Sequence, residues 1–260
     1  MNYNNNSSNN HPFRNLDLQG YTLVYQPIFD RARRLVKFEV LLRPKSSLQM
    51  PVYQLIAFAE RTGTIGIVDA WVRDKALSFL VKVHTIDPTV VMSVNLSPRS
   101  ITPELPAQLE AQLKGAGIAP ESLTLEITES QPLEDIPAKR KRIKAIQELG
   151  STFVLDDFCT RWSILNHLPH LPVNGLKIDC SYTWMIDKPG YGKYLIERIV
   201  QIARDFNLEV VVEGVETQAQ LKKVQELGVE YIQGFLLAKP MPAKQFLQFL
   251  TDHQQQRTAA

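Results

Sequence analysis

Short apolar runs alternate with amphipathic stretches along most of the chain. The runs are rich in Val, Ile, Leu, Phe and Thr, which favour β-strands. Strands are predicted at residues 21–29, 35–43, 89–97, 123–130, 152–158, 175–179, 209–216 and 231–238. Because helical patterns separate most of these runs, the sequence predicts a parallel sheet with helices packed on its outer side.

The stretches between the strands carry apolar residues at helical spacing, and several end at a glycine, as helices often do. Helices are predicted at residues 51–63, 67–84, 103–117, 136–150, 191–207 and 217–228. The first two strands are joined only by residues 30–34, which favours an antiparallel hairpin. The predicted fold class is therefore α/β, a modified (β/α)₈ TIM-type barrel with an antiparallel first strand. An open, doubly wound sheet is the alternative.

Composition narrows the class of protein. The chain has 260 residues, which suits one large barrel domain, and its formal net charge of +2 favours neither a nucleic-acid polymer nor a membrane surface as partner. Its two cysteines form no disulfide framework, no run is long enough for a membrane segment, and no secretory leader is visible. A cytoplasmic location is the expectation.

Both ends of the chain have polar, low-complexity sequences. Residues 1–18 are predicted to be a disordered tail and residues 253–260 a frayed C-terminal tail. The barrel domain is accordingly expected to occupy residues 19–252.

Polar residues recur at the carboxyl ends of the predicted strands, and these ends meet at one rim in a barrel. The residues are Glu39, Asn95, Glu126, Asp156, Asp157, Lys177, Glu213 and Gln233. Carboxylates and an amide without a His or Cys cluster suit a hard cation such as Mg²⁺ or Mn²⁺. Singly, each residue has an ordinary explanation, such as a solvated strand end or a helix cap. Their recurrence across the strands indicates a metal site.

Four of the polar residues suggest the chemistry. Adjacent carboxylates at Asp156 and Asp157 suit two-metal phosphodiester hydrolysis, in which one residue bridges both ions. Arg43 is placed to hold a phosphate with its forked donors. Lys177 is expected to orient a water molecule, or to deprotonate it if burial lowers its pKa. An unrelated metal-dependent barrel enzyme, such as a lyase, is a further alternative.

Several segments of the chain match the motifs of a known family. In order they are YQPIF, FEVLLRP, SVNLS, LEITES, LDDF, LPVNGLKID, VVEGVET and QGFLLAKPMP. From about Tyr21 to Leu250 the chain resembles the EAL-domain family of cyclic di-GMP phosphodiesterases. The resemblance implies a barrel that binds cyclic di-GMP across its rim and opens it to linear pGpG with one or two Mg²⁺ or Mn²⁺ ions, in second-messenger signalling.

The resemblance also implies a role for each matching residue. Glu39, Asn95, Glu126 and Asp156 would hold the first metal, and Asp156, Asp157 and Glu213 the second. Lys177, Glu213 and Asp157 would be the catalytic residues. The substrate-binding residues would be Gln26, Arg43, Asp179, Gln233 and Pro240, and the loop-anchoring residues Glu129 and Glu216.

Two departures from the family pattern bear on activity. Val40 replaces the alanine of the signature triplet and is expected to face away from the metal. Cys159 and Arg161 stand where two glycines are usual, and a left-handed backbone there costs a non-glycine residue about 1–2 kcal/mol. Slow hydrolysis is therefore expected, and a catalytically weak or inactive cyclic di-GMP receptor or protein-interaction module is the alternative. A homodimer contact through this segment, which includes Trp162, is a further expectation.

Overall fold

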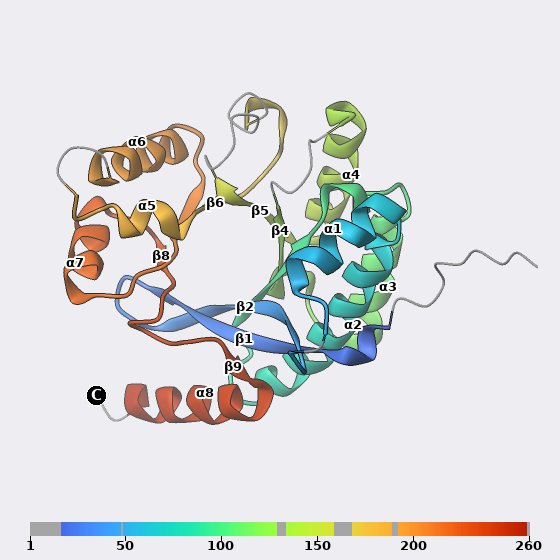
Figure 1. Cartoon of the computed structure of the whole chain (residues 1–260), viewed down its shortest axis with the longest axis horizontal. Coiled ribbons are helices and arrows are strands. Elements are labelled where there is room, and N and C mark those ends of the chain that lie inside the picture. Colours follow the sequence, from blue (N-terminus) through green and yellow to red (C-terminus); the bar gives the residue numbers. More distant parts are fainter. Residues whose placement is uncertain (1–16, 48, 129–133, 159–167, 189–191, 259–260) are drawn as a thin grey trace, which may run out of the picture.

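A closed barrel of strands forms the centre of the structure, and helices surround it (Figure 1). The computed structural model describes residues 17–47, 49–128, 134–158, 168–188 and 192–258. The strands in these residues are β1 (Tyr21–Asp30), β2 (Leu35–Pro44), β3 (Val91–Leu96), β4 (Leu123–Ile127), β5 (Thr152–Phe158), β6 (Gly175–Ile178), β7 (Glu209–Val212), β8 (Tyr231–Ile232) and β9 (Met241–Pro242).

Helices follow most of the strands. They are α1 (Val52–Thr62), α2 (Ile65–His84), α3 (Leu105–Ala116), α4 (Ile136–Leu149), α5 (Cys180–Trp184), α6 (Gly192–Asp205), α7 (Gln218–Leu227) and α8 (Ala243–Thr258). Short 3₁₀ turns lie at Leu18–Gly20, Pro98–Ser100, Pro120–Ser122 and Leu168–His170. Among the described residues, no helix is both long and apolar enough to cross a lipid bilayer.

The order of the strands confirms the predicted barrel. Strands β2 to β8 follow one another in parallel, and β1 closes the sheet by pairing antiparallel with both β2 and β8. The register of the first hairpin places Gln26 opposite Glu39. Parallel strands bring their carboxyl ends to one rim, so residues from β2 to β8 converge there.

The last two barrel strands are shorter than the sequence predicts. Strand β7 ends at Val212, because Gly214 has a φ of 71° and a Cβ at this position would lie 2.3 Å from the Cβ of Cys180. Strand β8 ends at Ile232, because the chain turns at Gly234, where a Cβ would lie 2.1 Å from the carbonyl oxygen of Val215. Glu213 and Gln233 therefore follow the strand ends directly.

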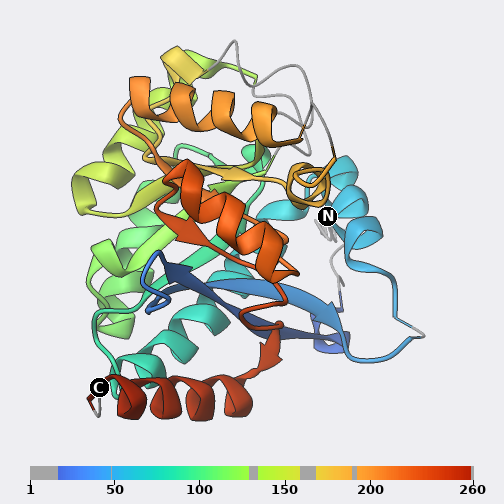
Figure 2. The same ribbon diagram turned by 90° about the vertical axis from the view of Figure 1, so that its left-hand side faces the viewer.

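The C-terminal segment differs from its prediction. Helix α8 continues to Thr258 and lies beneath β1 in both views (Figures 1 and 2), so residues 253–258 are helical and not a frayed tail. The helix is fixed because Phe246 is fully buried and His253 Nε2 accepts a 3.1 Å hydrogen bond from the backbone N–H of Leu35. Of the predicted N-terminal tail, residues 1–16 lie outside the described residues.

An aromatic cluster fixes α2 and α8 against the outer face of β1. Tyr25 of β1 stacks on Phe79 of α2 with their ring centroids 3.7 Å apart, and Phe246 of α8 lies 4.8 Å from Phe38 of β2. All four rings are buried, so each contributes about 1.5–3 kcal/mol through removal of apolar surface from water. The space between α2 and α8 is thereby held at a fixed width.

Candidate functional site

Lys177 of β6 lies at the centre of an acidic cluster, defined here as Glu39, Glu126, Asp156, Asp157 and Glu213. Its side chain is only 1% exposed. Its Nζ lies 3.2 Å from Glu39 Oε2, 2.9 Å from Glu126 Oε2, 3.0 Å from Asp156 Oδ1 and 2.6 Å from Glu213 Oε1. The structure thus brings together residues from β2, β4, β5, β6 and the end of β7.

An irregularity in β5 explains why two adjacent carboxylates serve one site. Neighbouring side chains of a regular strand point to opposite faces. Here the register of β5 against β6 shifts between Leu155 and Phe158, and Asp157 adopts a left-handed φ of 52°. One oxygen from each of Asp156, Asp157 and Glu213 therefore lies within 4.8 Å of the others.

Glu39 is held by neutral side chains on both of its oxygens. Oε1 accepts a 3.0 Å hydrogen bond from Asn95 Nδ2, and Oε2 accepts a 2.8 Å bond from Gln233 Nε2. Gln233 also donates to Gln26 Oε1 at 3.1 Å, and Gln26 Nε2 donates to the carbonyl of Ala238 at 3.3 Å. These bonds join β1, β2, β3 and the end of β8, and they fix the orientation of the Glu39 carboxylate.

Crowding raises the proton affinity of most of the acidic cluster. Burial raises the pKa of Glu126 well above its usual range, that of Glu213 to about 8, and that of Asp156 upward, although Lys177 opposes each shift. For Glu39, burial is outweighed by Lys177 and by the hydrogen bonds from Gln233 and Asn95, so its pKa is lowered. The cluster therefore binds protons tightly, and a cation that these oxygens coordinate could take the place of those protons.

The pKa of Lys177 argues against one of the two roles expected for this residue. Burial alone would lower its pKa, but the four surrounding carboxylates outweigh burial and raise it well above the usual range. The ammonium therefore keeps its proton. This direction of the shift does not fit a role as a base, and the ammonium is placed to orient the surrounding carboxylates.

The oxygen ligands fit a hard divalent cation. Asp156, Asp157 and Glu213 form the one group of three or more potential ligands at metal-binding spacing within the described residues. Asp156 Oδ1 is buried, and within the described residues it accepts no hydrogen bond apart from its 3.0 Å contact with the Lys177 ammonium. Glu39 and Glu126 contact the same Lys177 ammonium and Asn95 donates to Glu39, so these residues supply further carboxylate and amide oxygens close by. This donor set contains no sulfur or imidazole and suits Mg²⁺ or Mn²⁺.

The predicted substrate contacts lie at different depths. Arg43 is exposed at the end of β2, and its Nη1 donates to the carbonyl of Leu42 at 2.8 Å. Pro240 follows Ala238, the partner of Gln26, and is partly buried. Asp179 instead caps α5 by accepting a 3.0 Å bond from the backbone N–H of Ser181. Its carboxylate is therefore already used in the fold.

The loop-anchoring residues are less constrained by the structure. Glu216 is exposed just before α7, and its backbone N–H donates to Gln220 Oε1 at 2.8 Å. Glu129 lies outside the described residues, as do Cys159, Arg161 and Trp162. Val40 is buried beside Ile56 and Val68, so it packs under α1 and α2 as expected.

Two buried carboxylates behind Asn95 were not identified from the sequence. Glu60 of α1 accepts a 2.8 Å bond from Ser97 Oγ, and Asp69 of α2 accepts a 3.1 Å bond from the Ser97 backbone N–H. Asp69 lines a cavity of about 200 Å³ together with Arg43 and Asn95. The two carboxylates brace the segment that follows β3 and so position Asn95. The only signal was a charged residue at a core position of each helix.

We expect Asp69→Asn to stabilise the protein at neutral pH. Asp69 is 6% exposed, and burial raises the pKa of its carboxyl group to about 6, above the value in an unfolded chain. The folded state therefore binds this proton more tightly than the unfolded chain does. The proton stabilises the folded state fully below about pH 4, and this stabilisation is lost as the pH rises to about 6. The difference in the free energy of unfolding between the variant and the unmodified protein should be about 1–3 kcal/mol more in favour of the variant at pH 7 than at pH 4. Urea unfolding at the two pH values measures it. Equal differences at both pH values would contradict this assignment.

Comparisons with known proteins identify relatives over most of the chain. The sequence profile described as the EAL domain matches residues 13–240. The bifunctional diguanylate cyclase/cyclic di-GMP phosphodiesterase MucR of Pseudomonas aeruginosa is 32% identical over 240 residues, which are 89% of this chain and 35% of MucR. The cyclic di-GMP phosphodiesterase PdeL of Escherichia coli is 30% identical over 231 residues, 85% of this chain and 63% of PdeL.

The structural comparison agrees with the sequence comparison. The solved PaMucR phosphodiesterase in complex with c-di-GMP superposes with a TM-score of 0.81 at 31% identity, covering 89% of this chain and 96% of that chain. The chain spans about a third of the length of MucR and less than two thirds of PdeL. Fold, motif order and the position of the acidic cluster lead to one conclusion: the chain belongs to the EAL domain family.

Proposed function

We propose that this chain hydrolyses cyclic di-GMP to linear pGpG with the help of divalent metal ions. The observation that carries the proposal is the convergence of Asp156, Asp157 and Glu213 at metal-binding spacing beside the buried Lys177. Two relatives support cyclic di-GMP as the substrate, since PdeL is named a cyclic di-GMP phosphodiesterase and the PaMucR structure is a complex with c-di-GMP. The proposed setting is second-messenger signalling inside the cell.

The acidic cluster offers ligands for one or two ions. Glu39, Asn95, Glu126 and Asp156 would hold the first, and Asp156, Asp157 and Glu213 the second. When bound, Mg²⁺ or Mn²⁺ would polarise the phosphodiester and lower the pKa of the attacking water. Asp156 would contact both ions, and its buried Oδ1, whose one polar contact among the described residues is the Lys177 ammonium, supports this role.

The protein's own residues then position the reactants. Glu213 and Asp157 would border the place from which water attacks, and one of these carboxylates would accept its proton. Lys177 would hold the water and the carboxylates in place through its fixed positive charge. Gln26 and Gln233 keep Glu39 oriented, and Arg43 and Pro240 would contact the nucleotide.

The direct test is product analysis. Purified protein is incubated with cyclic di-GMP and Mg²⁺ or Mn²⁺, and the nucleotides are separated by chromatography. Appearance of pGpG that stops when EDTA is added supports the proposal. Binding of cyclic di-GMP without product would reject the hydrolase and favour the receptor alternative, which the glycine replacements at Cys159 and Arg161 already suggest. No binding and no product would reject both.

We expect Arg43→Ala to raise KM for cyclic di-GMP about tenfold and to change kcat much less. Arg43 is exposed at the rim, so its guanidinium is available to a phosphate but lies outside the acidic cluster. Arg43→Lys is the matched control, because it keeps the charge and loses the forked donors; an intermediate KM is expected. An unchanged KM in the alanine variant would show that Arg43 does not contact the substrate.

A further inference from the structure

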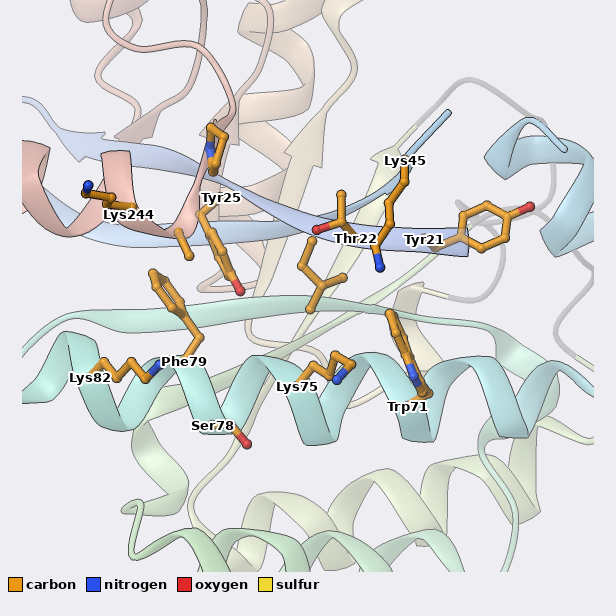
Figure 3. Close-up of a pocket in the computed structure, with 13 residues that line it drawn as sticks. Tyr21, Thr22, Tyr25, Lys45, Trp71, Lys75, Ser78, Phe79, Lys82 and Lys244 are labelled. Atoms are coloured by element: carbon orange, nitrogen blue, oxygen red, sulfur yellow. The ribbon is translucent and has the colours of Figure 1, made fainter. Parts of the chain in front are cut away.

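A second polar cavity lies on the outside of the barrel, between β1, α2 and the start of α8 (Figure 3). Its volume is about 570 Å³. Tyr25 lines it, whereas the next residue, Gln26, points inward to Gln233 and the acidic cluster. Because neighbouring side chains of a strand face opposite ways, the cavity and the acidic cluster lie on opposite faces of β1.

Four lysines surround this cavity, which is called the lysine groove below. They are Lys45, Lys75, Lys82 and Lys244. No Asp or Glu lines the groove, and none of the four lysines forms an ion pair in the part of the chain that the structure describes. By comparison, Lys37, Lys193 and Lys223 each form an ion pair with a carboxylate, so within the described residues the groove is a local concentration of unpaired positive charge.

The lysines reach the groove from different elements. Lys75 and Lys82 are seven residues apart on α2, so they lie on one face of that helix at a spacing of about 10 Å. In Figure 3, Lys45 extends from the opposite wall toward α2, and the Tyr25 hydroxyl points into the space between them. Positive charge and a hydroxyl donor therefore face the groove from both sides.

The groove also has a rigid aromatic wall. Tyr25 is stacked on Phe79, and the Lys75 Nζ lies 5.3 Å from the centroid of the Trp71 ring. The rings are held by the packing of α2 and α8, so the groove exists without a ligand. Its volume falls in the range of small-molecule sites and is too small for a folded partner.

We propose that the lysine groove binds a small anion with several linked phosphates, such as inorganic polyphosphate or a nucleoside triphosphate. A lysine ammonium binds phosphate as a point charge, so it does not need the matched planar geometry that the forked donors of arginine require. Linked phosphates place several charges within the span of Lys75 and Lys82, whereas a single phosphate reaches only one of them. The partly exposed Trp71 ring supplies a surface for the ring of a nucleotide.

The test is titration with sodium tripolyphosphate and, separately, with adenosine triphosphate. EDTA is present, so that no ion links the anion to the acidic cluster. Binding is measured by calorimetry and by the fluorescence of Trp71, with Trp71→Phe used to identify its signal. We expect saturable binding that weakens at high salt. Tighter binding of adenosine triphosphate would identify a nucleotide as the ligand, and tighter binding of tripolyphosphate an inorganic polyphosphate.

Charge removal provides the decisive comparison. The double variant Lys75→Gln with Lys82→Gln should weaken tripolyphosphate binding by about tenfold or more. The matched control is Lys141→Gln with Lys144→Gln on α4, two exposed lysines whose loss changes the net charge equally; it should alter affinity by less than about twofold. Equal weakening by both pairs, absence of binding, or a fluorescence change that persists in Trp71→Phe would overturn the proposal.

Discussion

Replacing Asp156 by asparagine is expected to lower kcat for cyclic di-GMP hydrolysis by about a thousandfold, which corresponds to about 4 kcal/mol. Asp156 is the residue at which the two proposed ligand sets meet, and its buried Oδ1 contacts the Lys177 ammonium at 3.0 Å. The amide has nearly the same shape but no negative charge, so metal affinity and water activation fall together. Initial rates at saturating Mg²⁺ and Mn²⁺ measure this effect.

Two measurements separate this result from a folding defect. The variant removes one of several crowded carboxylates, and burial raises the pKa of the Asp156 carboxyl, so metal-free stability should not decrease. The rise in melting temperature on adding metal should become smaller. Asp205→Asn, at an exposed carboxylate near the end of α6, should match the unmodified protein in both assays. Near-normal turnover by the Asp156 variant would exclude its metal-bridging role.

Replacing Lys177 by methionine is expected to destabilise the metal-free protein by about 3–5 kcal/mol. The substitution leaves four carboxylates facing one another in the barrel without the ammonium that lies within 3.2 Å of each. Breaking a buried ion pair from one side is costly because the remaining charge has no partner. Urea unfolding in EDTA at pH 8 measures the loss, and saturating Mg²⁺ should restore part of the stability while hydrolysis stays low.

The effect of Lys177→Met should depend on pH. Burial raises the pKa values of Glu126, Asp156 and Glu213, so the folded state binds more protons than the unfolded chain between about pH 4.5 and pH 8. Stability therefore falls as the pH rises through this range, and protonated carboxyl groups need the ammonium less. The deficit of the variant should be smaller at pH 5 than at pH 8.

A control for Lys177 is available at a more exposed ion pair. Lys37→Met also removes an ion pair, because Lys37 Nζ lies 2.8 Å from Glu209 Oε2, but these side chains are 15% and 48% exposed. This substitution should cost no more than about 1 kcal/mol. If the Lys177 variant in EDTA were as stable as the Lys37 variant, the ammonium would not be what holds the acidic cluster together.

The barrel and most of its site could be predicted because strand period and strand ends are local properties of the sequence. Strand β5 has its predicted bounds, and the residues around Lys177 were selected because each lies at or near a strand end. The truncation of β7 and β8 depends on close approaches of Gly214 and Gly234 to distant backbone and side-chain atoms. Sequence spacing contains no information about those approaches.

Other features depended on tertiary contacts in the same way. Helix α8 was not predicted, because its polar sequence is stabilised by Phe246 in the core and by His253 on β1. The roles of Glu60 and Asp69 required knowledge that both meet Ser97. The direction of the Lys177 pKa shift depended on how many carboxylates surround it, which strand ends alone do not specify.

The hydrogen bonds that hold Glu39 join the two ends of the barrel's chain, and this has a consequence for biosynthesis. Gln233 lies 194 residues after Glu39 and 207 after Gln26. At the usual 5–20 residues per second, a ribosome needs on the order of 10–40 s to make the segment between Glu39 and Gln233. During that interval β1 can pair with β2 but lacks β8 and β9, so one edge of the sheet stays open to unwanted pairing with other chains. The nascent polypeptide therefore acquires a correctly oriented Glu39 only when its last barrel strand has left the ribosome.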